Sequence, residues 1–186
     1  MTTDLTKEQY NKFEDYPQLT YNIIKYLIDN EQTLFRLLKY NDANAYRLDA
    51  THPNLTTAEK GQLIYNGIRP QNECRIFQTL GVSDSWQEQV SILRISVLDL
   101  IPTNYIIGNV SIIAETYNHD MIDTLSNYST RTDMITQLLI KNLNGSEIKG
   151  LGRLYFDTKA TSKCRSTVIG KIPIRGRATV FCNWSQ

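Results

Sequence analysis

The sequence predicts one α+β domain, in which N-terminal helices and one later helix pack on a mainly antiparallel sheet. Apolar residues recur at helical spacing in the N-terminal part, and they alternate at strand spacing in the middle and at the end of the chain. The 186 residues, 41% hydrophobic and 21% charged, have the size and composition of an ordinary globular domain. We therefore expect a polar N-terminal arm over residues 1–16 and a single domain over residues 17–186.

The N-terminal part of the domain is predicted to be helical. Its apolar stripe is interrupted at Asp29-Asn30, so we expect two helices before a loop at residues 41–55, which are rich in Asn, Asp and Ala. Thr56 and Glu59 then have the spacing of a capping box at the start of a further helix. We expect that helix to end at Gly67.

The middle of the chain changes to the two-residue period of strands. A first strand is expected at residues 74–80. In residues 89–100 and 105–117 apolar and polar side chains alternate, which predicts two long half-buried strands. A turn at residues 101–104 would join them as an antiparallel hairpin.

The last third of the chain returns to a helix and then to strands. Thr130 can cap a helix over residues 131–143, which should lie across the apolar face of the hairpin. Two closing strands are expected at residues 153–157 and 174–184. Between them, residues 158–173 have no clear period, and a loop of this length is usually functional or ordered by a partner.

Charge is unevenly distributed along the sequence. Residues 1–145 carry 12 Lys and Arg against 17 Asp and Glu, whereas residues 146–186 carry 8 against 2. The basic residues of the C-terminal part form either a solvated face or a surface that meets an acidic neighbouring subunit or passing DNA. Few aromatic residues lie among them, which argues against a platform for base stacking. The candidate interaction residues are Lys159, Lys163, Arg165, Lys171, Arg175 and Arg177.

Residues that commonly carry catalysis or bind metals do not form a pattern. His52 and His119 have no Cys or His partner at the spacing of metal ligands, and no nucleophile with an adjacent base is apparent. The carboxylates Glu115, Asp120 and Asp123 are interpreted as a solvated loop, with an acid/base pair or a cation site as the alternative. We therefore expect no enzymatic activity, no cofactor and no metal.

The sequence also predicts that the protein stays in the compartment in which it is made. It has no apolar run of the roughly 20 residues that a membrane-spanning helix requires, and its start lacks the order of a signal peptide. Cys74, Cys164 and Cys182 are odd in number and widely spaced, as in a reducing environment. Cys74 and Cys182 are expected to be buried small side chains in strands.

The order of the predicted elements resembles that of head-to-tail connector, or neck, proteins and tail terminators of tailed bacteriophages. The resemblance covers most of residues 20–184. Its most telling stretch is residues 131–157, where a helix runs into LNGSEIKGLGRLYFD, and residues 53–67 also resemble connector sequences. It implies a structural virion protein that forms an oligomeric ring between portal and tail and surrounds the DNA channel. Its partners would be further copies, the portal, neighbouring neck and tail proteins, and non-specifically the packaged DNA, with no membrane. The localisation would be the virion neck or tail, assembled in the host cytoplasm.

A second hypothesis belongs to another class of protein. The chain could be a small α+β nucleic-acid-binding or regulatory protein that uses its basic C-terminal third. Salt-dependent DNA binding by the monomer would favour this hypothesis, and ring formation with a portal partner would favour the connector.

Overall fold

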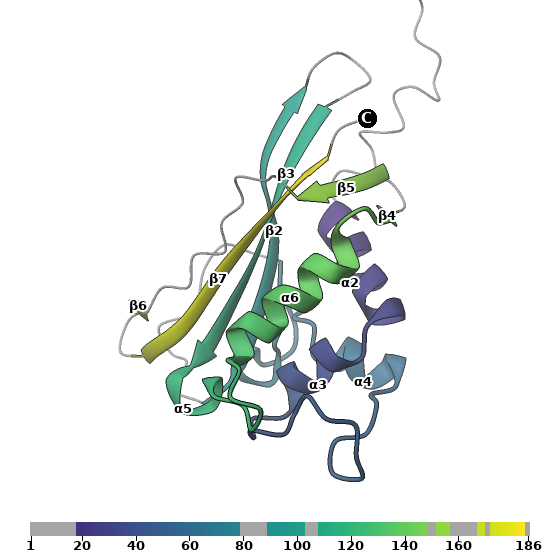
Figure 1. Cartoon of the computed structure of the whole chain (residues 1–186). Coiled ribbons are helices and arrows are strands. Elements are labelled where there is room, and N and C mark those ends of the chain that lie inside the picture. Colours follow the sequence, from purple (N-terminus) through teal and green to yellow (C-terminus); the bar gives the residue numbers. More distant parts are fainter. Residues whose placement is uncertain are drawn as a thin grey trace, which may run out of the picture.

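The protein is an α+β structure in which the helices lie on one side of a long, twisted sheet (Figure 1). The computed structural model describes residues 18–78, 89–102, 108–148, 152–156, 167–169 and 172–184. The predicted fold class is thus confirmed. The elements are α2 (Leu19–Asn30), α3 (Thr33–Lys39), α4 (Thr57–Gln62), the 3-10 helix η2 (Gln71–Glu73), β1 (Ile76–Phe77), β2 (Ser91–Pro102), β3 (Gly108–His119), α5 (Asp120–Asp123), α6 (Arg131–Leu143), β4 (Glu147–Ile148), β5 (Gly152–Phe156), β6 (Thr167–Ile169) and β7 (Ile172–Trp184).

Three long strands, β2, β3 and β7, form the body of the sheet. β2 and β3 are the predicted antiparallel hairpin, with Ser91 opposite Asn118 and an irregularity between Val97 and Asp99. β7 pairs antiparallel with the other side of β3 along its length. The order is β1-β2-β3-β7-β5-β4, with β6 also on β7, and β1 is parallel to β2. In Figure 1 the hairpin continues beyond the helices at the upper end of the molecule.

The helices cover one face of the lower half of this sheet. The apolar stripes of α2 and α3 are buried as predicted, as are Ile135, Leu139 and Leu143 of α6. They pack with Leu93 and Ile95 of β2 in the main core. A capped α6 over Arg131–Leu143 is confirmed, because the Thr130 hydroxyl accepts from the Asp133 N–H. The capping box of Thr56 and Glu59 is confirmed as well.

A smaller apolar cluster covers the opposite face of the hairpin. It contains Cys74, Phe77, Val90, Ile92 and Tyr117. Because successive strand residues point to opposite faces, Ile92 joins this cluster while Leu93 joins the main core. The prediction of half-buried strands is therefore wrong for the start of β2, where residues 91–96 are all buried.

Two predicted element ends near the N-terminal helices are wrong because tertiary pairing takes over. α4 ends at Gln62, not at Gly67, since Leu63 and Tyr65 leave the helix to exchange backbone hydrogen bonds with residues 75 and 76. Gly67 has φ +85° in the turn that follows. The expected strand at residues 74–80 is only Ile76–Phe77; its last two positions lie outside the described residues. Cys74 is buried as expected but precedes the strand.

Two predicted connections are partly strands. Pro102, which was assigned to the hairpin turn, pairs with Gly108, so β2 ends two residues later than expected. The end of a strand is one of the few sheet positions that tolerate proline. The predicted loop at residues 158–173 contains β6 and the first residues of β7, which pair antiparallel with Ile169 opposite Ile172. A β-branched run before a two-residue connection is a hairpin signal that the sequence does contain.

Candidate functional site

The basic residues predicted to form an interaction surface are only partly placed by the structure. Lys159, Lys163, Arg165 and Lys171 lie outside the described residues. Arg175 and Arg177 both belong to β7, and Arg177 is opposite Tyr117 of β3. Arg175 lies at the irregularity between Asn118 and His119. These two arginines are therefore at the end of β3 that leads into α5.

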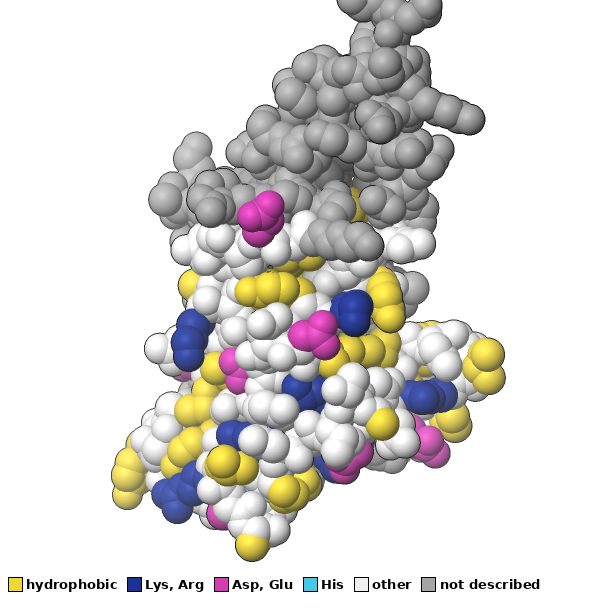
Figure 2. All heavy atoms as spheres, turned by 90° about the vertical axis from the view of Figure 1, so that its right-hand side faces the viewer, with side chains coloured by type: hydrophobic (Ala, Val, Ile, Leu, Met, Phe, Trp, Pro, Cys, Tyr) yellow, Lys and Arg dark blue, Asp and Glu magenta, His cyan; other side chains and the backbone are white. Residues whose placement is uncertain are grey.

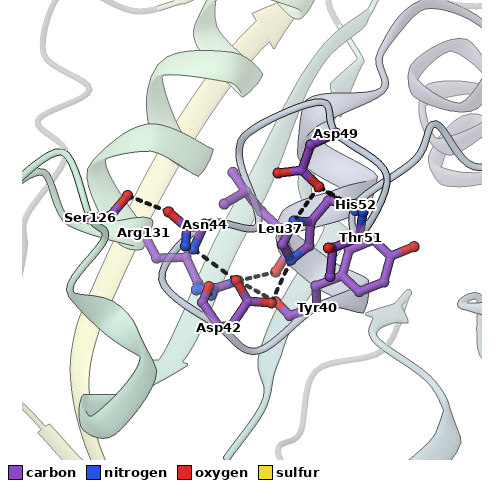
Figure 3. A network of polar contacts seen from close by, with 9 residues as sticks. All are labelled: Leu37, Tyr40, Asp42, Asn44, Asp49, Thr51, His52, Ser126 and Arg131. Atoms are coloured by element: carbon purple, nitrogen blue, oxygen red, sulfur yellow. Dashed lines mark hydrogen bonds and ion pairs between the residues drawn. The ribbon is translucent and has the colours of Figure 1, made fainter.

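The structure instead brings together a polar network that the sequence did not predict, shown in Figure 3. Its centre is Arg131, the first residue of α6, whose side chain is fully buried. Nε donates to the Ile122 carbonyl at 3.0 Å, Nη1 to the carbonyls of Tyr40 at 2.8 Å and of Leu37, and Nη2 to the Asp42 carbonyl at 2.8 Å. One guanidinium thus ties the end of α3 and the following loop to α5 and α6.

Burial has a clear electrostatic effect on Arg131. Removing the guanidinium from water lowers its pKa to about 10, although Asp42 and Asp123 oppose this shift. The group therefore remains charged at neutral pH, and its hydrogen bonds to carbonyls are of the stronger, charge-assisted kind. Cations also interact favourably with the carbonyl end of a helix, here the end of α3.

A second part of the network surrounds His52, in the loop that follows α3. Nε2 is 2.7 Å from Asp42 Oδ2, and Nδ1 is 3.0 Å from Asp49 Oδ1. The ring is buried and meets Tyr40 edge to face, with centroids 5.0 Å apart. Asp42 therefore links both parts, through its carbonyl to Arg131 and through its carboxylate to His52.

The two carboxylates favour the imidazolium form of His52. Its pKa is raised, chiefly by the hydrogen bond to Asp42, against the opposing effect of burial. Burial works against ionisation of Asp42, yet its hydrogen bonds with His52 and the Asn44 backbone hold its pKa below the usual value. The pKa of Asp49 is also lowered, first by the His52 backbone N–H. Because both ring nitrogens face carboxylates, neither is directed at a substrate, as a general base would require.

The stability contributed by His52 should depend on pH. A folded pKa above that of the unfolded chain means that this contribution is complete below about pH 6.5 and is lost as pH rises through the raised value. Asp42 and Asp49 have lowered pKa values, so their contributions to stability are lost only as pH falls below about 4. Between about pH 4 and about pH 6.5, we therefore expect the largest difference in melting temperature between the wild type and a less stable His52→Asn variant.

Thermal denaturation of both proteins from pH 4 to pH 9 measures this difference. Subtracting one melting temperature from the other cancels the titration of the groups that do not interact with His52. The difference should shrink at the alkaline end. A difference that stays constant across the range would show that the imidazolium does not contribute.

A separate buried cation fastens the end of α2. Lys60 of α4 is buried, and its Nζ donates to the carbonyls of Ile28 at 2.5 Å and Glu31 at 2.7 Å. It also lies 4.9 Å from the centroid of the Phe35 ring. Burial lowers its pKa, and Glu31 and Asp29 partly offset this. Lys60 and Arg131 therefore act alike, each as a cation on the carbonyl end of a helix.

The acidic residues interpreted as a solvated loop have another role at one position. Asp123 is buried, and its Oδ1 accepts from the Thr132 N–H at 3.0 Å and the Thr132 hydroxyl at 2.8 Å. It thus satisfies a free donor in the first turn of α6. Glu115 and Asp120 are on β3 and α5, and their side-chain surroundings are outside the described part.

Two features were searched for in the part of the chain that the structure describes, clusters of metal-ligating side chains and membrane-spanning helices. No group of three or more His, Cys, Asp and Glu side chains within it is placed to hold a metal ion. No helix in these residues has the length and apolar character needed to cross a membrane.

Comparisons with known proteins give one match. A family model described as YomW matches residues 31–168, from α3 to within β6. Comparison with curated proteins and with solved structures finds no match. The matched residues include the Arg131 and His52 network and both strands of the hairpin.

Proposed function

Because the chain belongs to the YomW family, whose members are phage-type proteins, we propose that it is a structural virion protein. It forms an oligomeric ring in the head-tail connector of a tailed bacteriophage, joins portal to tail and surrounds the DNA channel. It has no enzymatic activity and needs no cofactor. Its place is the neck or tail of the virion, to which it is added in the host cytoplasm.

The long sheet is the observation that carries this proposal. β2, β3 and β7 have 12, 12 and 13 residues, whereas strands usually have about five or six. Twelve residues extend about 40 Å, further than the small helical layer covers. The part of this sheet that extends beyond the helices can contact neighbouring subunits around a ring.

The hydrogen bonds that buried polar side chains form within the chain support a structural role. Arg131, Lys60 and His52 are all buried, and each is satisfied by groups of the same chain. Such networks hold helix ends and loops in place. A subunit that must keep one shape while it contacts several neighbours benefits from this arrangement.

The charge distribution favours homo-oligomeric contacts and also supports a second candidate function. Residues 146–186, with a net charge of +6, can meet an acidic part of another copy or a phosphate backbone. A small nucleic-acid-binding or regulatory protein would use the same residues. Binding of duplex DNA by the monomer, with an affinity that falls steeply with salt, would favour that alternative.

The connector proposal predicts a specific effect of the N-terminal arm. A chain without residues 1–16 should fold normally, because these residues carry no core pattern, but should be incorporated into particles less efficiently. Quantitative mass spectrometry of purified phage particles, with full-length and shortened chains expressed together, measures incorporation. Circular dichroism provides the folding control. Absence of the full-length chain from particles would refute the proposal, and equal incorporation would remove the arm from it.

A further inference from the structure

The sequence contains two Asn-Gly pairs, Asn66-Gly67 and Asn144-Gly145, which the structure holds in different ways. In an Asn-Gly pair the asparagine side chain can react with the next backbone nitrogen, because glycine has no Cβ to shield that nitrogen. All four residues are exposed, and the two glycines have positive φ values of 85° and 77°. Sequence, exposure and glycine conformation therefore do not distinguish the two pairs, but their hydrogen bonds do.

The Asn66 side chain is folded over the nitrogen of Gly67. Its Oδ1 accepts from the Ile68 N–H at 3.1 Å and from the Arg69 N–H at 3.0 Å. To reach these donors the side chain must run along the backbone past Gly67, which brings Cγ toward the Gly67 nitrogen. Within the described residues the Gly67 N–H donates no hydrogen bond, and the space beside its Cα is open. This nitrogen is therefore free to react.

The same two donors favour the reaction itself. When the Gly67 nitrogen attacks Asn66 Cγ, negative charge develops on Oδ1. The N–H groups of Ile68 and Arg69 already point at this oxygen, at distances close to those of an oxyanion hole. They stabilise the charged intermediate more than the neutral carboxamide, so the turn lowers the barrier to ring closure.

The Asn144-Gly145 pair is held by backbone hydrogen bonds on both sides. The Gly145 N–H donates to the Leu154 carbonyl at 2.8 Å, and the Asn144 N–H donates to the Ile140 carbonyl at 3.0 Å. The Leu154 N–H returns a bond to the Ser146 carbonyl at 3.0 Å. The Gly145 nitrogen must give up its hydrogen bond before it can attack, so this pair is protected while the protein is folded.

We propose that Asn66 is a site of spontaneous deamidation in the folded protein, and that Asn144 is protected from it. The Gly67 nitrogen loses its proton and forms a bond to Asn66 Cγ. The Cγ–Nδ2 bond then breaks, and Nδ2 leaves with a proton as ammonia. Water opens the resulting succinimide at one of its two carbonyls, which leaves aspartate or isoaspartate. The site is independent of the proposed function, because it needs only the folded chain.

Isoaspartate at position 66 should weaken the attachment of the segment between α4 and β1. It places the side-chain carbons in the main chain, directly after Tyr65, whose N–H donates to the Ile76 carbonyl at 2.9 Å. The N–H groups of Ile68 and Arg69 also lose their side-chain acceptor. We expect the isoaspartate form to melt roughly 2–4 °C lower than the unmodified protein.

The matched control for the added charge is Asn66→Asp. An aspartate keeps an acceptor for both N–H groups and does not lengthen the main chain. Figure 2 shows Lys and Arg interspersed with Asp and Glu over the described part of the side on which α4 lies in Figure 1, with neither sign gathered there in a patch. One more carboxylate should therefore have little effect, and Asn66→Asp should keep the wild-type melting temperature.

Peptide mass spectrometry of the full chain during incubation at mildly alkaline pH measures both sites at once. In the folded protein we expect Asn66 to deamidate at least roughly tenfold faster than Asn144. In a parallel sample unfolded in urea, the two rates should converge. Labelling with an isoaspartyl methyltransferase identifies the isoaspartate product, and Asn66→Gln should remove this label, because the longer side chain closes a ring far more slowly.

Three results would each overturn the inference. The first is an equal rate at Asn66 and Asn144 in the folded protein. The second is an Asn66 that stays intact in the folded protein and reacts only in urea. The third is an isoaspartate label in the folded protein that persists in Asn66→Gln, since the modified residue would then lie elsewhere in the chain.

Discussion

Replacing Arg131 with methionine is expected to destabilise the fold by about 3–5 kcal/mol. The guanidinium supplies hydrogen bonds to four backbone carbonyls, those of Leu37, Tyr40, Asp42 and Ile122. Methionine fills similar space but donates nothing, and each buried carbonyl left without a partner costs about 1–3 kcal/mol. Small domains have only about 5–15 kcal/mol of stability in total. The variant should therefore be close to unfolding at physiological temperature.

Urea denaturation of the variant and of two companions measures this effect. Arg47→Met is the matched control, because Arg47 is exposed and bonds only the neighbouring Tyr46 hydroxyl among the contacts described for it. Its change should stay within about 0.5 kcal/mol. Arg131→Lys keeps the charge with fewer donors and should lie between the two. A loss below about 1 kcal/mol for Arg131→Met would mean that water replaces the guanidinium.

Much of the fold was predictable because local signals and tertiary packing agree. α6 begins and ends as expected, since Thr130 caps it and its apolar side chains face the core. The break between α2 and α3 falls at Asn30 as predicted, and the main hairpin has the expected strands. In each case periodicity, capping and burial favour the same structure.

The polar network was not predictable, because it joins residues that are far apart in the sequence. Arg131 bonds carbonyls about 90 positions earlier, and Lys60 bonds carbonyls about 30 positions earlier. Periodicity gives the helix on which each lies but says nothing about backbone acceptors on another element. One signal was present in the sequence. A cation in the first turn of a helix is unfavourable because that end of the helix dipole is positive, so Arg131 at the start of α6 indicated a stabilising contact with another element.

The end of α4 and the parallel strand β1 show a different limit. Leu63 and Tyr65 fit a helix as well as an extended segment, and pairing with residues 75 and 76 decides between the two. Such pairing overrides weak local preference.

The basic residues of the predicted interaction surface remain a hypothesis, for which the structure places only Arg175 and Arg177, on β7.

The two buried cations, Lys60 and Arg131, stabilise the ends of the N-terminal helices in the same way. Helices α2 and α3 are short, and isolated helices of 12 and 7 residues are marginal in water. Lys60 and Arg131 bond carbonyls at or just beyond the ends of these helices, from elements that pack beside them. Lys60 thus joins α2 to α4, and Arg131 joins α3 to α5 and α6.

Replacing Lys60 with methionine is the second large effect that we expect, a loss of about 2–4 kcal/mol. The carbonyls of Ile28 and Glu31 lose a charged donor in a buried place, and the cation is removed from the Phe35 ring. Lys39→Met is the matched control, because Lys39 pairs with Glu59 at 2.9 Å in a partly exposed position, where ion pairs contribute about 0–1 kcal/mol. Urea denaturation should rank the two variants clearly. Because methionine can also pack well against Phe35, a Lys60→Met variant as stable as Lys39→Met would show that burial of the aliphatic stem, and not the ammonium group, holds α4 on the end of α2.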